Sequence, residues 1–449
     1  MKKIFQYIML AVVTIVMASC TSDIEEPTAT TGKSNVQLVV GEVPAFGDTQ
    51  TRAIGTPDEG KTSWAEGDEL LLEMTSKTFG TKYAAFTYNG SSWELTSGEL
   101  SYKEDEVPTF PHVYYAPNYK WEAGKLVLKE GKAAGTDEYI EGKANITPNG
   151  EAITVKFAEA TRNYSRLRIA TLPNEQITVD TEYFTPAGSS DMEQNGNYTL
   201  TSDEKGNAYL YGTFDNNSIV TVKYRGASLT THTFSQATES AKSYALDATV
   251  ISANSAEEIK SAIEQKVADG KTTIRLNLAP NAGTNEFMAI REAIKGAAPN
   301  DLGTIELTII GVETIPEEAF YKMLQLKSVR MFDVKEIKKY AFKECQYLTV
   351  VEAPSLNKLC SGAFKKCDQL AKLTFGPINY ADERNWPIFE YITQNIDLIL
   401  SDYQKEMIET DSYLYTANND RDYAGSDEHN SKNFLGREFR SITCRYKVK

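Results

Sequence analysis

The chain has few of the residues that enzymes commonly use for acid–base chemistry and metal binding. Only three histidines occur among its 449 residues, His112, His232 and His429, and they stand far apart in no metal-ligand spacing. The motifs G-x-S-x-G, H-E-x-x-H and G-x-G-x-x-G do not occur in the sequence. We therefore expect no catalytic residues, no metal and no cofactor, and predict that the protein is not an enzyme.

Basic residues are also fewer than acidic residues. The chain has 47 Lys and Arg against 62 Asp and Glu, which gives a formal net charge of −15. This balance argues against nucleic acid as a partner and against electrostatic binding to anionic lipid. Beyond the N-terminus, no apolar run reaches the roughly 20 residues that a membrane-spanning helix needs. The length favours two or three domains, because a single core rarely grows this large.

The N-terminus has the pattern of a secretion signal. Two lysines precede an apolar run over residues 4–16, and Met17-Ala18-Ser19 leads to Cys20. The run is too short for a stable transmembrane helix, so residues 1–19 are predicted to be a cleaved signal peptide. Small residues before a cysteine at this point resemble a bacterial lipoprotein box. The resemblance implies cleavage before Cys20 and acylation of its sulfur, and an ordinary signal peptide cut nearby is the alternative.

Residues 20–34 are polar and are predicted to form a flexible tether. The acidic stretch Asp23-Ile24-Glu25-Glu26 resembles the export signal of surface-exposed lipoproteins, although a solvated acidic linker is an equal alternative. With the lipoprotein box, this resemblance implies an outer-membrane lipoprotein of a Gram-negative bacterium, exposed at the cell surface.

Residues 35–249 have the pattern of an all-β region. Short runs rich in Val, Ile, Thr, Tyr and Phe alternate with turn residues, and Asn89-Gly90 is typical of a hairpin turn. The predicted strands include residues 35–40, 83–88, 126–128, 153–157, 167–170, 208–211 and 219–224. Strands at this spacing predict two β-sandwiches, over residues 35–153 and 154–249.

Several short motifs in this region resemble fimbrillin-like proteins. They are Thr51-Arg52-Ala53-Ile54, residues 64–70 (WAEGDEL), Trp93 with residues 110–117 (FPHVYYAP), and residues 160–169 (ATRNYSRLRI). The resemblance implies two transthyretin-like sandwiches and a relation to pilus subunits. In polymerising fimbrillins a trypsin-like protease cuts after an arginine near the N-terminus. Arg52 resembles that processing site, and the alternative is that it is an ordinary surface residue.

Near the C-terminus, three segments repeat with a period of 22 residues. The equivalent positions are Ile315, Ile337 and Leu359; Ala319-Phe320, Ala341-Phe342 and Ala363-Phe364; Met323, Cys345 and Cys367; Leu326, Leu348 and Leu370; and Val329, Val351 and Leu373. Such a period predicts an α/β leucine-rich-repeat solenoid, in which each unit buries its apolar face against its neighbours. The segment resembles BspA-like repeats, strongly over residues 312–376. The predicted domain is 250–449, with helices near 255–270 and 285–295, strands at 273–278 and 305–310, and a terminal cap.

Cysteines in the repeats allow two interpretations. Cys345 and Cys367 occupy equivalent positions, where a small apolar side chain fits the core, so a stacked ladder of free thiols is expected. A disulfide is the alternative, because the predicted compartment permits one, and the states of Cys360 and Cys444 are equally open.

The predicted binding residues come from the repeat strands. Side chains that do not enter the core of such a repeat line its concave face, and this places Ile310, Ser328, Arg330, Phe332, Glu352 and Lys372 outward. Phe332 is the strongest candidate, because aromatic and Arg residues contribute most to interfaces. Its alternative is packing against the domain's own terminal segments.

Together these patterns favour a lipid-anchored adhesin whose repeat domain binds a host or microbial surface macromolecule, either protein or glycan. The first alternative is a pilus tip or accessory subunit that binds other pilus subunits. The second is a lipoprotein that captures glycans for uptake. Clustered exposed aromatic residues would favour this second alternative, and the four tryptophans are spread along the sequence.

Overall fold

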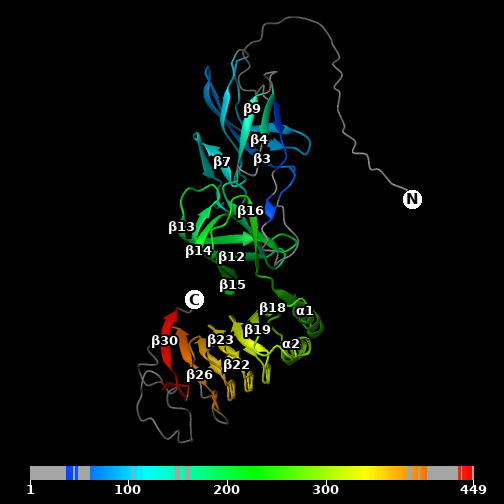
Figure 1. The fold of residues 1–449 in the computed structure, drawn as a ribbon, viewed down its shortest axis with the longest axis vertical. Helices are drawn as coiled ribbons and strands as arrows, with labels where there is room; N and C mark the ends of the chain where they lie inside the picture. The colour runs from blue at the N-terminus through cyan, green and yellow to red at the C-terminus, as the bar shows by residue number, and fades with distance from the viewer. Residues whose placement is uncertain are drawn as a thin grey trace, which may run out of the picture.

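The computed structural model describes residues 37–43, 46–48, 61–103, 106–146, 152–156, 162–381, 387–392, 395–401, 433–435 and 437–446 (Figure 1). The predictions for the signal peptide, the tether, Cys20 and Arg52 lie outside these residues. In the described part of the chain, no helix combines the length and the apolar character needed to cross a membrane.

The first β region is a seven-stranded sheet in the order β1-β10-β9-β6-β3-β4-β5. Its strands are β1 (Gln37–Val40), β3 (Glu69–Ser76), β4 (Gly80–Tyr88), β5 (Trp93–Gly98), β6 (Thr109–Tyr115), β9 (Ile140–Ile146) and β10 (Ala152–Lys156); β7 (Tyr119–Glu122) and β8 (Lys125–Leu128) form a separate ribbon. The unbroken apolar run of β3 follows from its place between β4 and β6, with both faces covered. Leu70 and Leu72 enter one core, and Leu71 packs with Tyr119 of the β7–β8 ribbon on the other face.

Asn89-Gly90 forms the predicted hairpin turn between β4 and β5. The Asn89 side-chain oxygen accepts hydrogen bonds from the backbone N–H groups of Ser91 (3.0 Å) and Ser92 (2.8 Å), and Gly90 has a positive φ of 92°. At the other end of the region, the boundary expected after residue 153 falls inside β10. This strand pairs with β1 and β9, so it belongs to the first sheet up to Lys156.

The second β region is a sheet in the order β13-β12-β14-β11-β16-β2, with β15 paired to β14. Its strands are β2 (Gly47–Asp48), β11 (Ser165–Ala170), β12 (Gln176–Pro186), β13 (Glu193–Thr201), β14 (Asn207–Tyr224), β15 (Ala227–Thr233) and β16 (Lys242–Asp247). The strands expected at 208–211 and 219–224 are one strand, β14. The intervening residues have turn composition, but Phe214 is fully buried there and pairs with Phe184, so packing keeps the chain extended.

The repeat region contains two parallel sheets. The larger one has the order β17 (Ile251–Ala253), β18 (Thr273–Leu278), β19 (Ile305–Ile310), β21 (Leu326–Met331), β23 (Val350–Ala353), β25 (Lys372–Phe375), β27 (Asp397–Ser401), β30 (Ser441–Tyr446). The smaller sheet joins β20 (Thr314–Ile315), β22 (Glu336–Ile337), β24 (Lys358–Leu359) and β26 (Tyr380–Ala381), and β28 (Asn433–Phe434) pairs with β29 (Arg437–Glu438). The 22-residue period sets the register, because Val329 pairs with Val351 and Val351 with Leu373.

Two helices precede the repeats. The first, α1 (Ala256–Ala268), begins at the predicted cap, where the Ser255 hydroxyl accepts a hydrogen bond from the Glu258 N–H at 3.3 Å. It ends just before Gly270, which adopts a positive φ of 73°. The second, α2 (Thr284–Ala297), buries Phe287, whose ring lies edge-on to Phe320 at 5.6 Å and so connects the helix to the repeat core.

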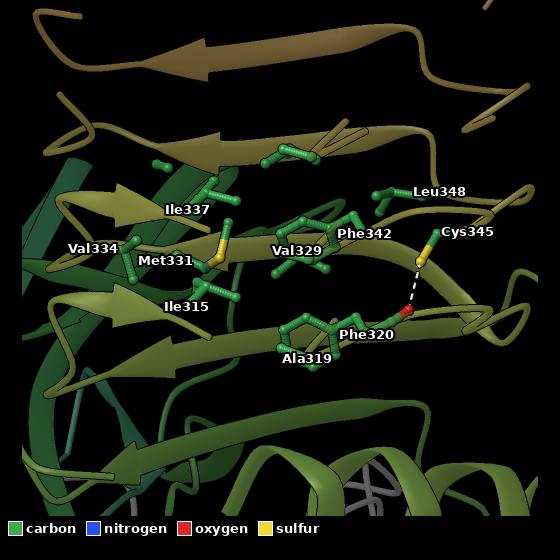
Figure 2. Close-up of a cluster of buried hydrophobic side chains, with 14 of the residues drawn as sticks. Ile315, Ala319, Phe320, Val329, Met331, Val334, Ile337, Phe342, Cys345 and Leu348 are labelled. Carbon is green, nitrogen blue, oxygen red and sulfur yellow. Dashed lines mark hydrogen bonds between the residues drawn. The ribbon is translucent and has the colours of Figure 1, made fainter. Parts of the chain in front are cut away.

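The repeat core is built from equivalent residues stacked on one another (Figure 2). Phe342 lies between Phe320 and Phe364, with ring centroids 5.0 and 5.4 Å away and nearly parallel planes. The thiols form the expected ladder: Cys345 Sγ donates to the Phe320 carbonyl at 2.9 Å, and Cys367 Sγ donates to that of Phe342 at 3.0 Å. None of the four cysteines that the structure describes forms a disulfide, and burial raises the pKa of Cys345 to about 12.

The turns on either side of each Ala-Phe pair also stack. The Lys322 N–H donates to the Lys343 carbonyl at 2.9 Å, and the Glu344 N–H donates to the Lys365 carbonyl at 2.8 Å. Each repeat has a left-handed backbone at two positions, one in the turn before the phenylalanine and one in the turn after it. These are occupied by Glu318, Tyr340 and Gly362 before the phenylalanine, and by Lys322, Glu344 and Lys366 after it, all with φ between 56° and 62°. Five of these six residues carry a Cβ, so the turns hold backbone strain.

Candidate binding surface

We define the outward sheet face as the side of the larger parallel sheet that points away from the repeat core. Its central row follows the strand register through Arg275, Thr308, Arg330, Glu352 and Thr374. Arg330 Nε donates to a Glu352 carboxylate oxygen at 3.2 Å. Two of the predicted binding residues therefore form an ion pair with each other. Because their charges cancel, this partly exposed pair presents little net charge to a ligand.

The first strands of the outward sheet face are covered by the second β region, which lies over β18 and β19 in Figure 1. Ile310 is fully buried in the same apolar cluster as Leu229 and Val250, and the half-buried Phe332 packs against that cluster. The prediction that Ile310 contacts a ligand is wrong, because the second β region occupies its surface. Phe332 packs internally, as its alternative interpretation held, but against the second β region instead of the terminal segments.

Ser328 is also unsuited to ligand contact, because only 6% of its surface is exposed. Its small side chain lies between Glu306 and Val350 in the register of the sheet. Of the six predicted residues, Lys372 is exposed, and Arg330, Phe332 and Glu352 are half-buried. Lys372 stands on β25, three strands along the sheet from β19.

Arg275 fixes the contact between the two regions. Its Nε donates to the Leu229 carbonyl at 2.7 Å, its guanidinium lies 3.8 Å from an Asp247 oxygen, and its side chain is 7% exposed. Burial tends to raise the pKa of Asp247, but hydrogen bonds from Thr249 together with nearby Lys266 and Arg275 bring that pKa below its ordinary value. Asp247 is therefore a carboxylate at neutral pH, and its negative charge compensates the positive charge of the buried Arg275 guanidinium.

A cleft of about 330 Å³ opens beside this contact. Its lining comes from β15, the end of β16, the segment between α1 and β18, and the first half of β18: Thr230, Leu246, Asp247, Gly270, Lys271, Thr272, Thr273 and Arg275. Asp247 and Arg275 of this lining pair with each other, so the cleft is a polar seam at the junction. Among the described residues, no cluster of three or more His, Cys, Asp or Glu has an arrangement that could hold a metal ion.

The uncovered half of the outward sheet face lies on β23, β25, β27 and β30. Lys372 on β25 pairs in register with Asp397 on β27, and Asp397 accepts hydrogen bonds from Arg440 Nε (2.8 Å) and the Ser441 hydroxyl (2.7 Å). The bond from Arg440, followed by that from Ser441, lowers the pKa of Asp397 to about 2. This half therefore alternates cations and anions, an arrangement that suits a polar protein or glycan surface.

Two of the tryptophans lie together although 29 residues separate them in the sequence. Trp64 and Trp93 meet edge-to-face with ring centroids 5.3 Å apart, and both pack on the core of the first β region. The indole N–H of Trp64 donates to the Gly41 carbonyl at 2.7 Å. This cluster stabilises the sheet from within, so it adds no support to glycan capture through exposed aromatic rings.

Sequence reasoning missed Arg275 and the docking of the second β region. One signal was present in the sequence: Ile310 and Phe332 are large apolar residues at outward positions of a face that is otherwise polar. Such residues at neighbouring strand positions indicate a buried contact as readily as a ligand site.

Comparison with known proteins identifies the repeats. Residues 304–416 match the family model of the BspA type leucine-rich repeat region, in six copies. The C-terminal part of the chain is a BspA-type leucine-rich repeat region. None of the curated proteins matches the chain.

The solved structures that match the chain include that of a candidate cell adhesion protein from Bacteroides fragilis NCTC 9343. The alignment covers 48% of this chain and 92% of that one, at 11% identity and a TM-score of 0.27. At this TM-score, the alignment does not establish a common fold.

Proposed function

We propose that this protein is a bacterial cell-surface adhesin, held in the outer membrane by a lipid on Cys20. Its BspA-type repeats would form a solenoid that binds a host or microbial macromolecule, carried on two transthyretin-like β-sandwiches. The observation that carries the proposal is the BspA-type repeat sheet, of which β23 to β30 remain uncovered by the second β region. A broad polar sheet without a deep cleft is suited to binding a macromolecule.

The uncovered half of the sheet can be tested by steric block. Thr374 lies at its centre, half-buried on β25, whereas Gln369 is exposed in the preceding turn of the same repeat. Beads coated with the full chain should adhere to epithelial or bacterial cells. Thr374→Arg should reduce adherence at least severalfold, and the matched control Gln369→Arg should leave it unchanged. If wild-type beads adhere no better than uncoated beads, the adhesin proposal is wrong.

Lipid anchoring has a separate test. Cys20→Ala removes the only thiol in the predicted lipoprotein box, and each buried acyl methylene contributes about 0.8 kcal/mol to membrane affinity. The variant should therefore leave the membrane fraction and appear in soluble fractions. A Cys20→Ala protein that stays in the membrane after its signal peptide has been removed would contradict the lipoprotein proposal.

A pilus accessory subunit is the second candidate, and the N-terminal strands favour it. Both β1 and β2 are edge strands, paired in the described structure only with β10 and β16, and both precede Arg52. Phe46, between them, is 3% exposed and packs against the rings of Tyr164 and Tyr211. Cleavage after Arg52 would release this segment and expose strand edges to which a partner strand could add.

Mass spectrometry of the protein extracted from cells separates the two candidates. A mature N-terminus at Ala53 supports the pilus subunit, whereas an intact lipidated Cys20 supports the anchored adhesin.

A further inference from the structure

The turns that flank the Ala-Phe pairs carry lysines and tyrosines at the surface of the repeats. We call this surface the Lys–Tyr ridge and define it by Tyr321, Lys322, Lys339, Tyr340, Lys343 and Lys366. Backbone hydrogen bonds join successive turns, from the Lys322 N–H to the Lys343 carbonyl and from the Glu318 N–H to the Lys339 carbonyl. The side chains of the ridge therefore follow the stacking of the repeats.

Lysines and tyrosines alternate along the ridge in cation–π contacts. The Lys343 ammonium lies between two rings, 5.0 Å from the Tyr321 centroid and 4.7 Å from the Tyr340 centroid. Lys322 lies 5.1 Å from the Tyr321 ring, and Lys339 lies 4.8 Å from the Tyr340 ring. Ring faces attract ammonium groups without neutralising them, so these contacts hold the lysines in place while their charge is retained.

The ridge is positive in a chain that is strongly negative. Residues 312–372 hold eleven Lys and Arg against eight Asp and Glu, a net charge of +3, whereas the whole chain is −15. Two ridge lysines share one carboxylate: Lys322 and Lys366 lie 3.5 and 3.9 Å from oxygens of Glu344. Their side chains are 54% and 45% exposed, so this single anion leaves the ridge positive and accessible.

The spacing of the charges selects the kind of ligand. Successive turns are one strand step apart, about 4.8 Å, so the ridge offers ammonium groups at regular short intervals. A single small anion would engage one turn, whereas a polymer with regular anionic groups would engage several. We propose that the Lys–Tyr ridge binds an acidic glycan, a polysaccharide with sulfate or carboxylate groups along its chain. This inference rests on the proposed function, since it names a ligand class for the adhesin.

A nucleic acid is the competing polyanion, and the two tyrosine rings disfavour it. The faces of Tyr321 and Tyr340 are engaged by lysines, so they do not offer free platforms on which bases could stack.

The test compares two triple variants of the full chain. The ridge variant is Lys322→Gln, Lys339→Gln and Lys343→Gln. The control variant is Lys327→Gln, Lys335→Gln and Lys358→Gln, which removes the same charge from exposed lysines that pair with Glu306, Glu313 and Glu336 elsewhere on the same repeats. Immobilised chondroitin sulfate, hyaluronan and neutral dextran serve as probes, so that sulfate and carboxylate recognition are separated.

The wild-type protein should bind one or both acidic polysaccharides, more weakly as salt is raised, and should not bind dextran. The ridge variant should lose about tenfold or more in affinity, and the control variant less than about twofold. Tyr340→Leu should weaken binding further than Tyr340→Phe, which keeps the ring under Lys343. Equal losses in the two triple variants, binding to dextran, or equal ridge-dependent binding to duplex DNA would overturn the proposal.

The outcome also separates this inference from the adhesin proposal. Beads that adhere to cells while neither acidic polysaccharide binds would overturn the ridge proposal alone. Ridge-dependent polysaccharide binding without any adherence to cells would overturn the adhesin proposal instead.

Discussion

Phe342→Ala tests whether the stacked aromatic rings stabilise the repeat region as one unit. The ring is fully buried, and it contacts Phe320 and Phe364 of the neighbouring repeats in near-parallel stacks. Truncating a buried Phe to Ala costs about 3–5 kcal/mol through lost burial and the cavity left behind. Two ring pairs are broken at once, each worth about 0.5–1.5 kcal/mol beyond area burial, so the loss should lie in the upper half of that range.

Hydrogen–deuterium exchange of the full chain measures this loss locally. The amides of β21 and β23, on either side of the missing ring, should lose protection together, because each repeat is stabilised mainly by its neighbours. Tyr391→Ala is the matched control, since this aromatic ring of the same region is 64% exposed and its removal should cost under about 1 kcal/mol. A loss below about 1 kcal/mol for Phe342→Ala would refute the shared-core reasoning.

Two further predictions concern backbone strain and pH. Glu318 has a φ of 56°, which glycine adopts without the steric cost of a Cβ, so Glu318→Gly should stabilise the repeats by roughly 0.5–1 kcal/mol. The control Glu317→Gly should destabilise them. Thermal unfolding of both variants measures the sign of each change. The folded-state pKa of Asp397, about 2, lies below its ordinary value near 3.9, so its contribution to stability is complete above about pH 4 and is lost as the pH falls to about 2. The difference in unfolding temperature between wild type and Asp397→Asn should therefore shrink from pH 5 to pH 2, and a constant difference would contradict the assignment to the bond with Arg440.

The repeats could be predicted from the sequence because the contacts that stabilise them join adjacent units and recur at a fixed spacing. Because the period is 22 residues, Ile315, Phe342 and Leu370 each contact the equivalent position of an adjacent repeat. Their place in the core therefore follows from the period. The strand over residues 305–310 and the cap at Ser255 were predicted for similar reasons, since a neighbouring residue or an equivalent repeat position decides each of them.

The features that could not be predicted from the sequence depend on contacts between segments that are far apart in the chain. Nothing local shows that residues 212–218 are extended, because the reason is the burial of Phe214 against Phe184. Likewise, Ile310 fits an exposed apolar anchor and a docking residue equally well until Leu229 of another region is placed above it. Which part of the candidate face stays open therefore depends on the docked second β region, and no pattern within the repeats indicates it.

The parallel pairing of β1 with β10 has a mechanical consequence. A chain held at its N-terminus and pulled through a ligand on the repeats receives force at the start of β1 and at the end of β10. In a parallel pair these points are at opposite ends, so tension shears the hydrogen bonds of the pair together. In an antiparallel edge pair, the same tension would open the bonds one at a time from one end. The pairing would resist force applied through the lipid anchor proposed at Cys20. Single-molecule pulling from residue 35 should give a higher rupture force than pulling that unzips β1 from its C-terminal end.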